Sequence, residues 1–177
     1  MLKKLSAVTL TTLLLLIPVP VAAAKVEPAG DAVIYGQPDE ASMASRVTAM
    51  ASHLDGNGYW VATANGMVLN FGSAGHFGDM DSVTLNQPVV GMAPTKTGNG
   101  YWLVASDGGI FSFGDAAFYG SAGAVVLNSP IVGMAATNAG RGYWLVAADG
   151  GVFSYGCLLY TSPSPRDLST SRMPSSA

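Results

Sequence analysis

The sequence predicts an all-β protein built from tandem four-stranded antiparallel blades of about 42 residues, which form a partial, truncated β-propeller. Three observations predict this fold. Gly-Tyr-Trp recurs at a constant spacing, at residues 58–60, 100–102 and 142–144. Residues 72–113 and 114–155 are identical at more than half of their positions. No segment after the first 24 residues has the apolar periodicity of an amphipathic helix. A repeat of this length cannot bury its own apolar face, so neighbouring copies must cover it.

The first 24 residues have the pattern of a secretory signal peptide. Lys3 and Lys4 precede an apolar run over residues 5–17, and small residues lead to an expected cleavage site after Ala24. The run is shorter than the roughly 20 residues that span a bilayer. The pattern predicts an extracytoplasmic protein, secreted or associated with the cell surface, without a transmembrane span after cleavage.

Composition excludes several function classes. Cys157 is the only cysteine, so no internal disulfide is expected. Residues 25–156 contain ten acidic and four basic residues, which argues against a nucleic-acid partner because no basic stripe is present. No motif for a cofactor or a metal ion is evident, and neither is expected.

The repeats are expected at residues 30–71, 72–113 and 114–155. In the clearest copy, the apolar runs 89–93, 101–105 and 110–113 predict three strands. A fourth strand is expected at 117–120, with counterparts at 75–78 and 33–36. The five consecutive apolar residues of 101–105 are typical of a strand that is covered on both faces.

Two-residue turns are expected between the second and third strand of each repeat. The residues at these turns are Asn65 and Gly66, Asp107 and Gly108, and Asp149 and Gly150. Asn-Gly and Asp-Gly suit tight hairpins. The exchange of Asp for Asn favours a turn over a calcium site, because a ligating carboxylate would not freely become an amide.

The register of the repeats also predicts incompleteness. The first repeat element after the signal is the fourth strand around Tyr35, and the last is the third strand at 153–155. In many closed propellers a strand from one terminus completes the blade begun at the other. Three blade equivalents are fewer than the usual four to eight, so further repeats are expected beyond Gly156.

Residues 157–177 depart from the repeat and are rich in Ser and Pro. A disordered linker is one interpretation. The run CLLYTSPSPRDLSTSRMPSSA also resembles the translation of a sequencing adapter, and we favour that artefact.

Two strings, GYWLVASDGGIFSFGDAAFYGS at 100–121 and PIVGMAATNAGRGYWLVAADGGVFSYG at 130–156, resemble a repeat family of secreted actinobacterial proteins. The resemblance covers residues 30–156. It implies propeller-like blades, and such repeats often accompany a separate envelope hydrolase domain (amidase, peptidase or esterase). No such domain is visible here, so the resemblance transfers no catalytic residues.

Six aromatic residues are the candidate ligand-binding residues: Trp60, Trp102, Trp144, Tyr59, Tyr101 and Tyr143. An indole face can stack on a sugar, but their place inside apolar strands favours core packing. The Tyr and Trp of each pair are adjacent in a strand and point to opposite faces, so one set is expected to pack between blades. His53 and His76 occur once each and favour packing roles over proton transfer.

The leading functional hypothesis is a secreted, non-catalytic binding or scaffold region at the bacterial cell surface, with cell-wall glycan or a surface protein as partner. The alternative is the repeat region of a larger envelope hydrolase. A third interpretation, an aromatic-repeat solenoid similar to choline-binding wall modules, would need a repeat about half as long, and none is apparent.

Overall fold

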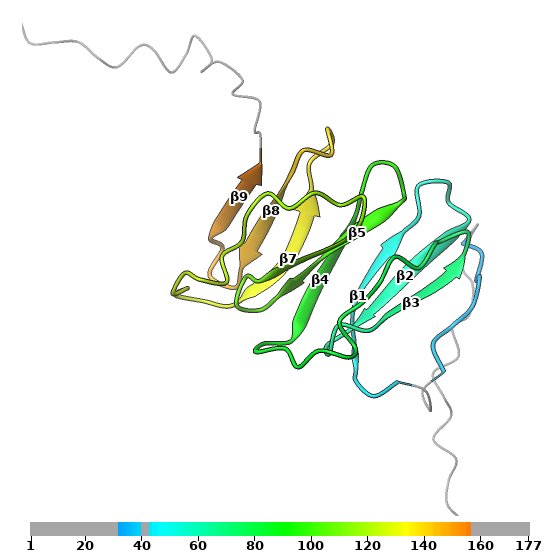
Figure 1. Ribbon diagram of the computed structural model, residues 1–177, viewed down its shortest axis with the longest axis horizontal. Coiled ribbons are helices and arrows are strands. Elements are labelled where there is room, and N and C mark those ends of the chain that lie inside the picture. Colours follow the sequence, from blue (N-terminus) through cyan, green and yellow to red (C-terminus); the bar gives the residue numbers. More distant parts are fainter. Residues whose placement is uncertain (1–31, 40–42, 157–177) are drawn as a thin grey trace, which may run out of the picture.

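The computed structural model describes residues 32–39 and 43–156. The signal-peptide and tail interpretations therefore fall outside the described residues. Within them every regular element is a strand, and the strands form three antiparallel sheets of three strands each (Figure 1). The all-β prediction is confirmed.

The sheets follow one another along the chain, and each contains its strands in sequence order. The first sheet contains β1 (Val47–Ser52), β2 (Gly58–Thr63) and β3 (Val68–Gly72); the second contains β4 (Val89–Pro94), β5 (Gly100–Ala105) and β6 (Ile110–Gly114); the third contains β7 (Ile131–Ala136), β8 (Gly142–Ala147) and β9 (Val152–Gly156). The Gly-Tyr-Trp motif always begins the middle strand. All six residues of β5 are buried, as its apolar run predicts.

The pairing register repeats from sheet to sheet, irregularities included. In each first strand the register shifts at one position, between Val47 and Ala49, Val89 and Gly91, and Ile131 and Gly133. Such a bulge bends and twists its strand. The same bend in every sheet gives the three sheets a common shape, which allows them to stack.

The expected turns lie between the middle and third strands. Gly66, Gly108 and Gly150 have φ values of 86°, 83° and 87°. Residues with a Cβ atom rarely adopt such positive φ angles. Asp107 and Asp149 each accept a hydrogen bond from a backbone N–H two residues later. Asn65 Oδ1 accepts one from the hydroxyl of Thr63 at 2.6 Å. These polar side chains thus stabilise the turns themselves.

The expected fourth strand does not form, so the prediction of four-stranded blades is corrected to three-stranded sheets. Residues 33–36, 75–78 and 117–120 are instead extended segments without ladder pairing. In the second of them, the carbonyl of Gly75 accepts from Trp60 Nε1 at 2.7 Å, and that of Gly78 accepts from the Tyr101 hydroxyl at 2.5 Å. Side chains of two different sheets therefore bind backbone carbonyls that a neighbouring strand would otherwise pair.

The three sheets stack in an open row, with β1, β4 and β7 side by side (Figure 1). Backbone bonds connect the sheets: Val89 N donates to Ala64 O at 2.9 Å, and Ile131 N donates to Ser106 O at 2.8 Å. Each contact between sheets encloses an apolar core. The described residues thus form a row of sheets, and this row does not close into a ring.

Candidate binding surface

The burial of the candidate aromatic residues depends on which sheet of the row carries them. Trp60 and Trp102 are buried, and each lies against the tyrosine of the following sheet, Tyr101 or Tyr143, with ring centroids 5.7 Å apart. Trp102 Nε1 donates to Ala117 O at 2.8 Å. The faces of these rings pack against protein, so they offer no platform for a sugar.

The aromatic residues at the two ends of the row are more accessible than those between the sheets. Tyr59, in the first sheet, is half-buried and donates its hydroxyl to Gly36 O. Trp144, in the third sheet, is exposed. The sequence groups six equivalent aromatic residues together, but the structure leaves only these two accessible to a partner.

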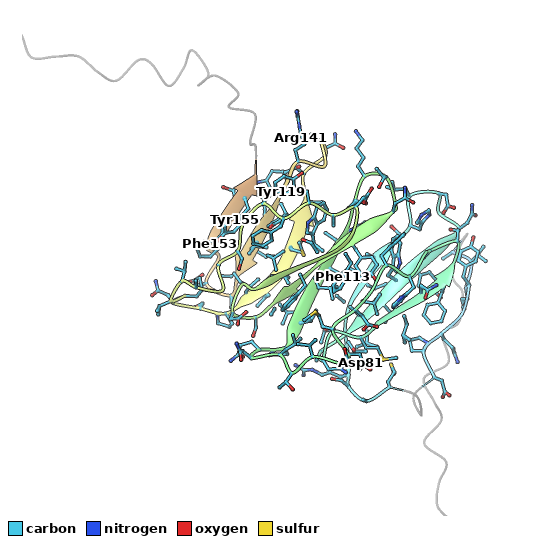
Figure 2. The ribbon with its side chains drawn as sticks, viewed as in Figure 1. Asp81, Phe113, Tyr119, Arg141, Phe153 and Tyr155 are labelled. Atoms are coloured by element: carbon cyan, nitrogen blue, oxygen red, sulfur yellow. The ribbon has the colours of Figure 1, made fainter. Side chains whose placement is uncertain are left out.

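The buried tyrosines act as hydrogen-bond donors between the sheets. Burial raises the pKa of Tyr101 to about 12, and burial also raises the pKa of Tyr143. Both hydroxyls therefore stay protonated at neutral pH. Each donates to a glycine carbonyl of the preceding segment, at Gly78 and Gly120, at 2.5 Å. Figure 2 shows Phe113, which packs against Tyr101, at the centre of the molecule between the first two sheets.

The structure assembles one polar cluster that the sequence interpretation missed. Asp55 Oδ1 lies 2.8 Å from His53 Nδ1 and accepts from Ser73 Oγ at 2.9 Å. Ser73 Oγ also lies 3.4 Å from the same Nδ1. A serine nucleophile and its carboxylate partner would need opposite ring nitrogens of the histidine. Here both share one nitrogen, so the arrangement does not fit nucleophilic catalysis.

The environment of Asp55 supports a structural role for this cluster. The backbone N–H of Asn57 donates to the carboxylate at 2.8 Å, and this bond, with help from His53, lowers the pKa of Asp55 to about 2. The ring of His53 tilts against Trp60, with centroids 5.3 Å apart. The cluster thus holds the β1–β2 turn against the residue that follows β3.

The second repeat builds the same connection from different residues. Asp115 accepts from Thr95 at 2.8 Å and also from Thr97. Its carboxylate stands at the position of Ser73, and Thr97 stands at that of Asp55. A comparison of these positions between the repeats would have revealed the exchange of donor and acceptor. Among the described residues, no group of three His, Cys, Asp or Glu side chains is placed to hold a metal ion.

A groove of about 480 Å³ crosses the row of sheets. Its walls come from the ends of the three adjacent first strands and the turns that follow them. One methionine from each repeat lines it: Met50 is exposed, Met134 is half-buried, and Met92 is buried at its floor. Lys96, Thr137 and Asn138 add polar groups. The groove is therefore a composite site with an apolar ladder and a polar margin, built from equivalent positions of three repeats.

A smaller hollow of about 290 Å³ lies at the opposite end of the strands. Gln87, Ser106 and Asn128 contribute to it, and Ser106 Oγ donates to Gln87 Oε1 at 3.3 Å. Its lining residues come from one junction between two repeats. The groove along the first strands is the better candidate for a binding surface because all three repeats contribute to it.

Comparisons with known proteins do not identify a family. No protein-family model matches the chain, and no curated protein matches it significantly. Within the part of the chain that the structure describes, there is no helix long and apolar enough to cross a membrane.

Proposed function

We propose that this chain is a non-catalytic binding or scaffold region of an exported protein that acts at the bacterial cell surface, and that the groove along β1, β4 and β7 binds its ligand. The observation that carries the proposal is the composition of the groove. Three repeats contribute equivalent methionines to one continuous surface. Methionine side chains adapt to irregular apolar partners, and concave apolar sites with a few polar groups are the usual form of ligand sites.

We propose a cell-wall glycan as the ligand class. The C–H faces of sugar rings match the methionine ladder, and ring hydroxyls match the polar groups of Thr137 and Asn138. Lys96 adds a cation that suits carboxylated sugars or peptide stems. The resemblance to secreted actinobacterial repeats supports the cell surface as the location.

We also propose that the row is an arc of a β-propeller, in which each extended segment occupies the place of the outermost strand of a blade. Two features support this arc. The first strands lie side by side, as innermost strands do around a propeller axis. The segments 75–78 and 117–120 contact the middle strand of the next sheet through Tyr101 and Tyr143. Further sheets of the same repeat would complete the ring.

Retention on cell-wall glycans tests the binding function. The purified full chain is expected to bind immobilised glycan, and Met50→Lys is expected to weaken retention about tenfold because it places a charge on the apolar ladder. Met50 and Val126 are both exposed, and only Met50 lines the groove. Val126→Lys is therefore the matched control and should bind normally. Retention no greater than that of an unrelated all-β protein would refute the glycan proposal.

The alternative function, the repeat region of a larger envelope hydrolase, remains a prediction from the sequence resemblance. An independent read of the gene beyond Gly156 tests it together with the adapter interpretation of residues 157–177. A downstream catalytic domain would support the hydrolase, and reappearance of the same tail would refute the artefact.

A further inference from the structure

Two cations stand close together at the end of the groove, where turns join the first and middle strands of the sheets. Lys96 lies in the β4–β5 turn and lines the groove. Arg141 lies in the next turn of the row, between β7 and β8. The two turns are in contact, because a Cβ atom placed on Gly140 would lie 3.3 Å from the Cβ of Lys96. Lys96 and Arg141 therefore carry their charges on adjacent turns at one rim of the groove.

Both cationic side chains are exposed, and neither forms an ion pair with another described residue. Two carboxylates, Asp55 and Asp115, belong to the same end of the strands. Asp55 accepts a hydrogen bond at 2.9 Å from Ser73, which follows β3. Asp115 itself follows β6 and accepts from Thr95 at 2.8 Å. These carboxylates bond to the protein beside the third strands, whereas the groove follows the first strands.

The opposite end of the strands is acidic. Asp107 and Asp149 lie in the turns between the middle and third strands, and Asp81 accepts a hydrogen bond at 2.7 Å from the equivalent turn of the first sheet. Figure 2 shows Asp81 and Arg141 at opposite ends of the molecule. Among the described residues the only cation at the acidic end is Arg46, which precedes β1. An anionic ligand is therefore repelled from that end and attracted to the groove end.

The overall charge of the protein opposes the binding of acidic ligands. The chain has a formal net charge of −3 at pH 7. Its summed field therefore repels a polyanion, and salt screens charges that lie more than about 10 Å apart at 0.1 M ionic strength. Only cations that contact the ligand can then favour an acidic one. Lysine supplies a compact point charge, and the planar fork of arginine binds a carboxylate through two parallel hydrogen bonds.

We propose that the groove binds a glycan whose sugar rings carry carboxylates, and that Lys96 and Arg141 select this acidic ligand. The inference rests on the proposed function and defines its ligand class more closely. A sugar ring with a carboxylate offers its C–H face to a methionine of the groove and its charge to a cation at the rim. A polyol-phosphate chain has the charge but no ring face, and a neutral glycan has the ring face but no charge. Only the carboxylated glycan matches both parts of the groove.

Retention on two forms of one polymer tests the selection. The purified full chain is applied to immobilised polygalacturonate and to its methyl ester, which keeps the sugar rings and lacks the charge. We expect about tenfold tighter retention on the acid at low salt, because two exposed charge pairs contribute about threefold each. The ratio should fall toward one as salt screens the pairs.

The outcomes separate this inference from the proposed function. Equal retention on the acid and the ester would overturn the inference and leave the glycan function standing. Tighter retention on poly(glycerol phosphate) than on polygalacturonate would also overturn it. A chain that binds none of the three polymers would refute the glycan function as well.

Substitution of single cations identifies the selecting residues. Lys96→Gln and Arg141→Gln should each lower the ratio of acid to ester retention about threefold. Arg46→Gln is the matched control: it removes an exposed cation from the opposite end and should keep the wild-type ratio. All three variants have the same net charge, so a general effect of charge would lower all three ratios equally. An unchanged ratio in both groove variants, or an equal fall with Arg46→Gln, would overturn the proposal. Far-UV circular dichroism checks the fold, which substitutions of exposed side chains should preserve.

Discussion

Ser112 and Asn70 occupy equivalent positions on β6 and β3, and their hydrogen bonding differs. Asn70 Nδ2 donates to Ala74 O at 2.9 Å. Ser112 Oγ is buried and has no hydrogen-bond partner. Each residue lies opposite the buried tryptophan of its sheet, Trp60 or Trp102. The shorter side chain in the second sheet therefore leaves a polar atom unsatisfied where the first sheet satisfies one.

We expect Ser112→Asn to stabilise the protein by about 0.5–1.5 kcal/mol, because the longer amide reaches the carbonyl of Ala116 as Asn70 reaches Ala74. Urea unfolding measures the change in the free energy of unfolding. The reverse exchange, Asn70→Ser, is the matched control and should destabilise by a similar amount. Destabilisation by Ser112→Asn would show that the second sheet lacks the space of the first.

The buried tyrosines predict how stability depends on pH. Burial raises the pKa of Tyr101 from 10.0 to about 12, and the negative charge of Asp79 adds to this effect. Between these values the folded state holds a proton that the unfolded state has released, so stability is complete below pH 10 and falls as the pH rises toward 12. Unfolding free energies across this range, followed with tyrosinate absorbance, measure the loss. Tyr101→Phe should make the decline shallower, and stability unchanged from pH 10 to 12 would contradict the expectation.

At the level of elements, the extended segment 75–78 joins two sheets without belonging to either ladder. Gly78 has a φ of 121°, and a Cβ there would lie 2.9 Å from Phe113 Cδ1. This glycine permits the close approach of backbone to ring. The Tyr101 hydroxyl serves two backbone groups of the segment, as donor to Gly78 O and as acceptor from Phe77 N at 3.4 Å.

We expect Tyr101→Phe to cost about 1–3 kcal/mol, because two backbone groups next to a buried side chain lose their partner. Tyr119→Phe is the control: it removes a hydroxyl that donates to Gly140 O at 3.1 Å in a turn, from a half-buried side chain. Its expected cost is below about 1 kcal/mol. Denaturant unfolding of the two variants measures the difference, and equal costs would argue against the segment as a connector of sheets.

For the whole molecule, stability depends on how many neighbours a sheet has. The second sheet packs on both sides, whereas the first and third each have one neighbouring sheet in the described row. In repeat arrays the energy is a sum over units and their contacts with neighbours. The residues of β9 alternate between exposed and half-buried, whereas those of β5 are all buried.

Amide hydrogen exchange should therefore be slowest in β5 and fastest in β9, with β8 between them, because local opening of the end sheet breaks fewer contacts. Mass spectrometry of peptides from each strand measures the order. Faster exchange in β5 than in β9 would contradict stability set by neighbouring sheets.

Much of the local structure follows from the sequence pattern. The runs 89–93, 101–105 and 110–113 predict three strands that the structure places at Val89–Pro94, Gly100–Ala105 and Ile110–Gly114. The prediction of a fourth strand was wrong because an apolar pattern indicates extended backbone but does not identify the hydrogen-bond partners of that backbone. Side chains, and not a neighbouring strand, bind these segments. The cluster of His53, Asp55 and Ser73 was missed for a similar reason. His53 and Asp55 lie in the turn between β1 and β2, whereas Ser73 follows β3. The three side chains meet only when the strands pair into a sheet.

The sequence by itself determined the repeat length, the all-β class and the position of each hairpin, because these depend on side chains close together along the chain. Only the tertiary structure decided what the aromatic residues do. Trp60, Trp102 and Trp144 stand in nearly identical sequence surroundings, yet two are buried and one is exposed. The physical reason is that a sheet covers the tryptophan face of the sheet before it. Burial, and with it the capacity to bind a partner, depends on the place of a repeat in the row.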